Sequence, residues 1–426
     1  MKLETLTEEE FNEFSLKHEQ YTFYQNTSWG HLKSLNGWKM HLVGYKTKNT
    51  VIAGAMLLEK STPIKKKMFY APRGFLLNYN DKDLVKNFTY DIKQYVKRNG
   101  GFFIKIDPYL IYEERDIDGE IVKDGINNEN ILKTLKELGY KYYGRNTKTE
   151  KELQPRWMFA LDLDGTTDEI FNNFSNDTKR YIHRCEKNGL EVHEMKNDEL
   201  DKYKAIMEHT AKRRGFIDRP ISYYESMIKE LGKDVKILLC TLNTTNLLEK
   251  LNTEKEQIEK DLEYIEEKIK ENDGKKAKSQ KKQKEQELNT VNKRIEDAKE
   301  LEKEYGKEIV MAGSMFITSG PEIIYLFSGS YDHFMKYNPQ YIIQWEIIKY
   351  GIKNGYKKYN FYGISGTFDK NDPMYGIYLF KRGFNGKVIE LIGEFDLVVN
   401  SFYYRLYKIA FSIYHNLKNI KNKIKK

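Results

Sequence analysis

The residues of this sequence that could take part in chemistry are cations and carboxylates rather than nucleophiles or metal ligands. No stretch matches the GxSxG nucleophile elbow or the HExxH zinc motif, and Cys185 and Cys240 form no CxxC pair. Asp107, in "FFIKIDPYL", ends an expected strand, where polar side chains commonly line clefts. Lys381, in "YLFKRGF", ends an expected helix, where a surface lysine would compensate the helix dipole just ahead of Gly383. We expect no metal ion and no cofactor.

The composition indicates a folded protein that tolerates an anionic partner. The chain has 426 residues, which is more than one ordinary core holds and suggests two or three domains. A formal net charge of +9 allows an anionic partner without requiring one. Two cysteines, and a start with no basic segment followed by an apolar run, favour a reduced cytosol. No stretch approaches the roughly 20 apolar residues of a membrane span, so we expect a cytoplasmic protein.

The elements that must position these residues form a repeat. Alternating and aromatic-rich runs predict strands at about 40–47, 51–60, 67–71 and 101–107, with a helix near 82–98. Later, "IVMAGSMFI" answers "VIAGAMLLE", "EIIYLFSGS" answers "KMFYAPRG", and "WEIIKYGIKNGYKKYNFYG" answers "DIKQYVKRNGGFFIKID". The order predicts a duplicated α+β domain, each copy with a hairpin, a third strand, a helix and a fourth strand. Chance likeness within Lys/Tyr/Ile-rich sequence is the alternative.

A long insertion separates two strands of the second copy. The strands of the first copy are joined by a short turn near Lys48 and Asn49, and the corresponding turn becomes residues 243–306. A hairpin turn accepts such an insertion at little cost to the core. Apolar residues at three and four spacing predict an antiparallel coiled-coil hairpin, with arms of roughly 35–45 Å. They are Leu248, Leu251, Ile258, Leu262, Ile265 and Ile269, then Leu288, Val291, Ile295, Ala298 and Leu301.

The far end of this hairpin is basic. Clustered cations make contact with a phosphate backbone a natural hypothesis, although a charged coil face is often only solvated. The cluster consists of Lys275, Lys276, Lys278, Lys281, Lys282 and Lys284.

The carboxyl-terminal residues 396–426 predict a basic amphipathic helix. An apolar stripe at helical spacing runs beside several lysines, a pattern typical of contact with anionic lipid. A helix docked on its own domain is the alternative. The stripe consists of Leu406, Ile409, Ile413, Leu417, Ile420 and Ile424, and the lysines are Lys408, Lys418, Lys421, Lys423, Lys425 and Lys426.

Several of these stretches together resemble one family. "YLFSGSYDHFMKYNPQYIIQWEIIKYG", "NFYGISG" and "YGIYLFKRGFNGKVIELIG" look like the FemABX aminoacyltransferases of Gram-positive bacteria, over about residues 24–395. The resemblance implies two tandem GNAT-like (acyl-CoA N-acyltransferase-like) domains, with the helical arm inside the second. We place the domains at 1–150 and at 151–242 with 307–395, the arm at 243–306 and the terminal helix at 396–426.

The resemblance also implies a reaction and residues for it. An amino acid would pass from aminoacyl-tRNA to an amine on the stem peptide of a lipid-linked or UDP-linked peptidoglycan precursor. Such an acyl transfer needs proximity, a path for a proton and oxyanion stabilisation. Lys381 matches the family lysine that faces the reacting carbonyl, with Phe380 beside it lining the acceptor pocket, and Asp107 matches a suspected base.

The remaining residues carried over from the resemblance are contacts to the substrate. Lys33, and Arg219 with Tyr223, match positions that resemble phosphate and precursor contacts, and such cations suit a pyrophosphate. Tyr325 matches one pocket tyrosine. The second tyrosine of the family pattern is Phe327 here, so the resemblance implies an acceptor pocket that lacks this hydroxyl.

Two other classes of function remain open from the sequence. An acyl-CoA-dependent GNAT transferase would normally carry [RQ]-x-x-G-x-[GA] to bind the pyrophosphate, and no stretch fits that pattern. A non-catalytic coiled-coil tRNA-binding protein is the other class, and the presence of Lys381 in its matching motif argues against it. Both comparisons favour an aminoacyl-tRNA-dependent transferase.

Overall fold

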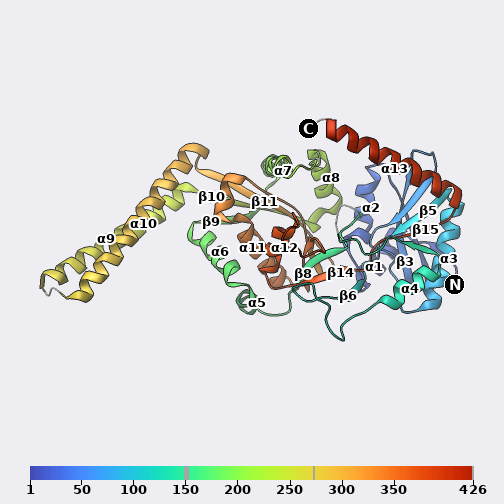
Figure 1. Ribbon diagram of the computed structural model, residues 1–426, viewed down its shortest axis with the longest axis horizontal. Helices are drawn as coiled ribbons and strands as arrows, with labels where there is room; N and C mark the ends of the chain where they lie inside the picture. Colours follow the sequence, from blue (N-terminus) through green and yellow to red (C-terminus); the bar gives the residue numbers. More distant parts are fainter. Residues whose placement is uncertain (148–152, 272–273, 425–426) are drawn as a thin grey trace.

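We analysed a computed structural model, which describes residues 1–147, 153–271 and 274–424. Two β-sheets with their covering helices lie next to each other, and a pair of long helices projects from the second (Figure 1). In the last helix the side chains are described as far as residue 413. The side chains of the predicted residues beyond it lie outside the described part: Leu417, Lys418, Ile420, Lys421, Lys423, Ile424, Lys425 and Lys426.

The first sheet has seven strands in the order β1-β2-β3-β4-β5-β15-β7. Successive strand residues face opposite sides, so Val43 packs toward helix α3 while Leu42 packs toward α1 and α2. The strands are β1 (Glu4–Thr5), β2 (Lys39–Thr47), β3 (Thr50–Ser61), β4 (Lys67–Ala71), β5 (Gly101–Ile106), β7 (Tyr140–Tyr142) and β15 (Phe395–Val398). The helices are α1 (Glu8–Lys17), α2 (Thr27–Ser34), α3 (Lys82–Arg98) and α4 (Glu129–Glu137).

The second sheet has eight strands in the order β6-β14-β8-β13-β12-β11-β10-β9. The strands are β6 (Ile111–Glu114), β8 (Trp157–Asp162), β9 (Leu190–Glu194), β10 (Val235–Asn243), β11 (Glu308–Ser319), β12 (Glu322–Ser330), β13 (Lys358–Gly363) and β14 (Lys387–Leu391). The helices of this half are α5 (Thr167–Asn173), α6 (Asn176–Lys187), α7 (Leu200–Arg214), α8 (Ile221–Leu231), α11 (Pro339–Lys353) and α12 (Tyr375–Arg382). On β10, Cys240 packs toward α6 and α11, whereas Leu239 packs toward α7 and α8.

The predicted repeat is present in the strand pairing. In the first sheet, β2 and β3 are antiparallel, β3 and β4 are antiparallel, and β4 and β5 are parallel. Strands β10, β11, β12 and β13 repeat the same directions, and α3 and α11 occupy the same place in the two orders. The predicted α+β class and the repeat are therefore confirmed, since chance likeness would not reproduce the pairing.

The arm occupies the hairpin turn that the repeat identified. Lys48 and Asn49 form the short turn in the first copy, with φ of 48° and 67° as a type I′ turn requires. In the second copy α9 (Thr244–Glu271) and α10 (Lys275–Tyr305) replace it. The ends of the arm meet where Thr244 N–H donates to the Lys307 carbonyl at 3.0 Å. Figure 1 shows the two helices side by side, pointing away from both sheets.

The arm buries its seam most fully in the half of the two helices that is nearer the sheets. Leu251, Ile258, Val291, Ile295 and Ala298 are buried between the helices, and all five belong to the predicted seam. Farther out, the seam residues are only partly buried. At about 1.5 Å per residue, α9 is roughly 42 Å long and α10 roughly 47 Å long, at or just above the upper end of the length expected from the sequence.

The two halves exchange strands, which the sequence did not suggest. Strand β6 from the first half pairs with β14 in the second sheet, and β15 from the second half pairs with β5 and β7 in the first. The fully buried Glu390 on β14 forms ion pairs with Arg115 at 2.7 Å and Arg156 at 3.1 Å. Strands of each predicted domain therefore pair with strands of the other domain. This exchange does not test the predicted domain boundaries, which stay a prediction.

The last helix, α13 (Ser401–Ile424), lies along the first sheet. Tyr404 and Tyr407 pack on Phe103 of β5, with ring centroids 5.4 and 5.5 Å away. Within the described residues, no helix combines the length and apolar character needed to cross a membrane.

Candidate active site

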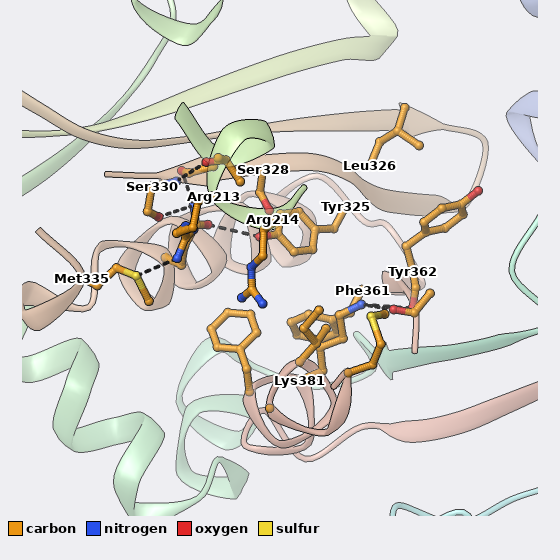
Figure 2. A pocket seen from close by; sticks show the side chains of 18 of the residues that line it. Arg213, Arg214, Tyr325, Leu326, Ser328, Ser330, Met335, Phe361, Tyr362 and Lys381 are labelled. Atoms are coloured by element: carbon orange, nitrogen blue, oxygen red, sulfur yellow. Dashed lines mark hydrogen bonds between the residues drawn. The ribbon is translucent and has the colours of Figure 1, made fainter. Parts of the chain in front are cut away.

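A cavity of about 880 Å³ opens in the second half of the molecule. Its walls come from the end of α7, from β12, from the start of α11, from the end of β13 and from α12. Figure 2 shows side chains from these elements pointing toward one another across the cavity.

The cavity exists because two parallel strands separate. Strands β12 and β13 pair only from Glu322 opposite Lys358 to Ile324 opposite Asn360. Beyond that point β12 contributes every residue from Tyr325 to Ser330 except Phe327 to one wall, and β13 contributes Phe361 to Gly363 to another. A register shift occurs in each strand where the separation begins, between Met315 and Phe316 in the β11 pairing and between Asn360 and Tyr362 in the β8 pairing. Such bulges bend strands and are common beside active sites.

Lys381 lies at the inner end of this cavity. It is only 5 % exposed, so the alternative of a surface lysine that merely compensates the helix dipole is wrong. Its Nζ donates to the carbonyls of Gly363 at 2.6 Å and Tyr362 at 3.3 Å. Burial lowers the pKa of Lys381 from 10.5 to about 7. Tyr362 has φ of +66°, an uncommon value for a side chain of its size, and the bulge there directs both carbonyls toward the amine.

A polar network fixes the wall opposite α12. Gln340, at the start of α11, accepts hydrogen bonds from the Tyr325 hydroxyl at 3.2 Å and from Ser314 at 2.9 Å. Its amide nitrogen donates to the Gly329 carbonyl at 2.9 Å. Phe380 lines the cavity next to Lys381, so the structure brings the predicted Tyr325, Phe380 and Lys381 together.

A separate basic cluster lies between the two halves. Lys33 on α2 stacks its Nζ over the Trp29 ring at 4.4 Å, and the Arg219 guanidinium stands over the Tyr223 ring at 5.3 Å. Burial, followed by repulsion from Arg219 and Lys60, lowers the pKa of Lys33 to about 8. Neither Lys33 nor Arg219 forms an ion pair within the described residues. Two like charges held together in this way favour an anion between them.

Tyrosine hydroxyls connect the basic cluster to the cavity. Tyr24 packs edge-on against Trp29 at 5.0 Å, and its hydroxyl lies 2.7 Å from that of Tyr362. The Tyr362 hydroxyl also donates to Gln154 at 2.7 Å. The carbonyl of the same Tyr362 accepts a hydrogen bond from Lys381. Tyr362 therefore contacts both the first half, through Tyr24, and the lysine of the cavity.

Two more predicted site residues, Asp107 and Phe327, lie outside the cavity, as the basic cluster does. Asp107 is 2 % exposed and accepts from the Arg73 backbone N–H at 2.8 Å, with the Arg73 guanidinium 3.5 Å away. Burial, partly opposed by Arg73, raises the pKa of Asp107 to about 7. Phe327 packs edge-on against Tyr224 at 6.1 Å and is turned away from the cavity. Asp107 as a base and Phe327 as an acceptor contact stay predictions.

The lysines near the end of the arm differ in their partners. Lys281 pairs with Glu266 at 2.7 Å, and Lys284 pairs with Asp261 at 3.0 Å, in both cases across the two helices. Lys275, Lys276 and Lys282 are exposed and form no ion pair within the described part of the chain. Those three are therefore the cations most available to a phosphate backbone.

Three residues of the site went unnoticed in the sequence. Gln340 and Tyr362 gave no local signal, because their roles depend on the separation of β12 and β13. Arg214, the last residue of α7, also lines the cavity. Its sequence "AKRRGF" is typical of a helix end, where cations compensate the dipole.

Comparisons with known proteins give a consistent result. The model of the FemAB family matches residues 6–411. Aminoacyltransferase FemA from Staphylococcus aureus (strain MRSA252) is 32% identical over 428 residues, covering 100% of both chains. FemA from Staphylococcus aureus (strain NCTC 8325 / PS 47) matches equally, at 32% over the full length of both. Among solved structures, the crystal structure of FemX has a TM-score of 0.81 and 26% identity, covering 95% of this chain and 99% of that chain.

Proposed function

Because the chain belongs to the FemAB family and is an aminoacyltransferase, we propose that it acts in building the interpeptide bridge of peptidoglycan. In this proposal an amino acid passes from aminoacyl-tRNA to an amine on the stem peptide of a lipid II type precursor, with a UDP-linked precursor as the other acceptor. The proposal rests on family membership, on the cavity around Lys381 and on the basic cluster.

The observation that carries the proposal is the setting of Lys381. In the transfer, the neutral acceptor amine attacks the ester carbonyl, and negative charge develops on the carbonyl oxygen. The bond to the tRNA ribose oxygen then breaks, and the proton lost by the amine ends on that oxygen as the ribose hydroxyl. An ammonium has three N–H donors, and the carbonyls of Tyr362 and Gly363 take two of them. The third is left for the oxyanion in a buried site, where such a contact is worth most. No nucleophilic side chain is needed, because the ester is already activated.

The basic cluster supports an acceptor that carries a pyrophosphate. Lys33 and Arg219 lie between the halves and have no carboxylate partner among the described residues. In the proposal they bind the pyrophosphate, and Tyr223 packs beside it. The tyrosine pair Tyr24 and Tyr362 then spans the distance toward Lys381.

The arm supports a donor with a large polyanionic body. The aminoacyl group alone offers little binding energy, and remote contacts can help to orient the reacting carbonyl. Lys275, Lys276 and Lys282 are placed at the far end of a stiff helical pair that buries its own seam. In the proposal these lysines contact tRNA phosphates, and each contact adds to the salt dependence of binding.

The last helix supports contact with the membrane surface that would hold a lipid-linked acceptor. Its aromatic face is used for docking, since Tyr404 is buried on the first sheet. Its other face points outward, with Phe402 65% exposed, Leu406 40%, Ile409 58% and Ile413 55%. No acidic residue follows Asp396 in the sequence. In the proposal this outward face lies on anionic lipid at the inner side of the cell membrane.

A transfer assay tests the proposed reaction directly. The protein is incubated with charged total tRNA and a lipid-linked precursor, and the product is analysed by mass spectrometry. The expected result is a mass increase equal to one amino acid residue. Transfer from acetyl-CoA in place of aminoacyl-tRNA would support the acyl-CoA-dependent alternative, and no transfer from either donor would support the non-catalytic one.

A further inference from the structure

The cavity around Lys381 is lined by three cationic side chains and, among the described residues, by no carboxylate. The cations are Arg213, Arg214 and Lys381. Two of these cations are occupied. Lys381 is bonded to two carbonyls, and Arg213 lies 2.8 Å from Asp332. Arg214 is therefore the lining cation whose side chain is not engaged by a described group.

Arg214 has no partner in the described part of the chain. It is exposed, and no described carboxylate or carbonyl accepts a hydrogen bond from it. Figure 2 shows its side chain extending into the cavity, between the wall formed by β12 and the helix that carries Lys381. A guanidinium in this position can form two parallel hydrogen bonds to an oxyanion.

Phe216, two residues after Arg214 in the sequence, lines the same cavity. It is 47% exposed, although phenylalanine is usually buried. It follows Gly215, whose φ of 73° ends α7 and turns the chain. Proteins that bind single-stranded nucleic acid commonly combine cations that contact phosphates with aromatic side chains on which bases stack.

We propose that Arg214 binds the phosphate of the donor's terminal nucleotide, and that the base of this nucleotide stacks on Phe216. The inference rests on the proposed function and adds to it a subsite next to the reacting ester. The phosphate is the one attached to the 5′ oxygen of the nucleoside that carries the amino acid. An oxyanion could also come from a carboxylate of the acceptor, and the donors chosen below distinguish the two sources.

The test compares minimal donors that differ by a single phosphate. Both donors carry the amino acid as an ester on the 2′ or 3′ oxygen of adenosine, and only one of them has a phosphate on the 5′ oxygen. Each is used with the same precursor, for the wild type and for Arg214→Gln. We expect the wild type to prefer the phosphorylated donor, with kcat/KM higher by about 10- to 100-fold, the range for one charged hydrogen-bonded contact. Arg214→Gln should lose most of this preference and be close to the wild type with the donor that lacks the phosphate.

The matched control is Lys212→Gln, which removes an exposed cation from the same turn of α7. Lys212 does not line the cavity, so this variant should keep the preference for the phosphorylated donor. Equal losses with both donors in Arg214→Gln, or a rise in KM for the acceptor alone, would overturn the inference in favour of an acceptor contact. An unchanged preference would also overturn it. If the wild type uses no aminoacyl ester at all, the proposed function itself fails.

Discussion

Replacing Lys381 by methionine should separate its chemical role from its effect on stability. Methionine has a similar length and no charge, and it fits buried sites without a large change in volume. We expect the folded variant to lose transfer activity by at least about 10²-fold in kcat, the scale for one oxyanion-stabilising donor. Lys381→Arg keeps a cation and should retain more activity than the methionine variant.

The effect on stability can be worked out from the burial of the amine. Burial lowers the pKa of Lys381 from 10.5 to about 7. Between these two pH values the unfolded chain holds a proton that the folded protein has released, so stability rises with pH. At 1.36 kcal/mol per pKa unit, the cost of burying this lysine is on the order of 4 kcal/mol at pH 7 and about 2 kcal/mol at pH 9.

Urea titrations at these two pH values measure the predicted difference. Methionine carries no proton, so the free energy of unfolding of the wild type should gain about 2 kcal/mol relative to Lys381→Met between pH 7 and pH 9. Other titrating groups cancel, because both proteins share them. A difference that stays constant with pH would show that Lys381 is charged throughout this range, and would refute the reasoning from burial.

The pH dependence of kcat tests which form of the amine works. The ammonium has one donor left after its two carbonyl contacts, whereas the neutral amine has none and presents a lone pair instead. If the ammonium stabilises the oxyanion, kcat should fall as pH rises through about 7, and Lys381→Arg should lack this fall. If kcat rises through about 7 and Lys381→Arg is inactive, the amine acts as a base and the oxyanion role is wrong.

Three further predictions concern the binding surfaces. Lys33→Ala and Arg219→Ala should each raise KM for a precursor with a pyrophosphate by about 10-fold or more, with little effect on one that lacks it. Deleting 246–303 and closing the hairpin with a short Gly-containing turn should weaken tRNA binding and flatten its salt dependence in filter-binding titrations, while unchanged affinity would favour a protein-partner role for the arm. Ile409→Asp should weaken sedimentation with anionic vesicles, whereas Ser412→Asp, with the same change in charge, should do so much less; equal effects would argue against insertion of the apolar face.

Much of the fold could be read from the sequence, because its signals are local. The alternation of "VIAGAMLLE" and the turn at Lys48 and Asn49 belong to one hairpin, and both are present at the expected residues. The seam of the arm repeats every three or four residues, and Leu251 and Val291 are buried as expected. Because the second copy repeats the same order of stretches, the strands of the second sheet could be predicted from those of the first.

The exchanged strands could not be predicted, because their pairing is not local. Residues 111–114, "IYEE", are too few to show a strand pattern, and their pairing with β14 connects positions about 275 apart. The same holds for Glu390, which looks like an ordinary surface glutamate in the sequence but is fully buried among arginines. Its charge is acceptable there only because Arg115 and Arg156 arrive from distant segments.

Charged residues of the site were predicted in position but not in environment. The sequence placed Lys381 at a helix end and Asp107 at a strand end, and both are there. It could not indicate that Lys381 is buried without a carboxylate, or that Asp107 is held by Arg73. These environments set the pKa values, and they depend on how strands and helices from both halves meet.

The two copies of the repeat differ where the cavity forms. In the first copy, β4 pairs with β5 along its whole length, from Lys67 to Ala71, so no space opens between the strands. In the second copy, β12 is longer, yet it pairs with β13 only over its first three residues, and every later residue except Phe327 lines the cavity. The parallel pair can separate there because its free edges are satisfied by other groups, including Lys381 on the carbonyls of β13. The residue proposed to act in catalysis therefore also helps to hold open the strands that form its site, which is why its removal has to be judged by activity and stability together.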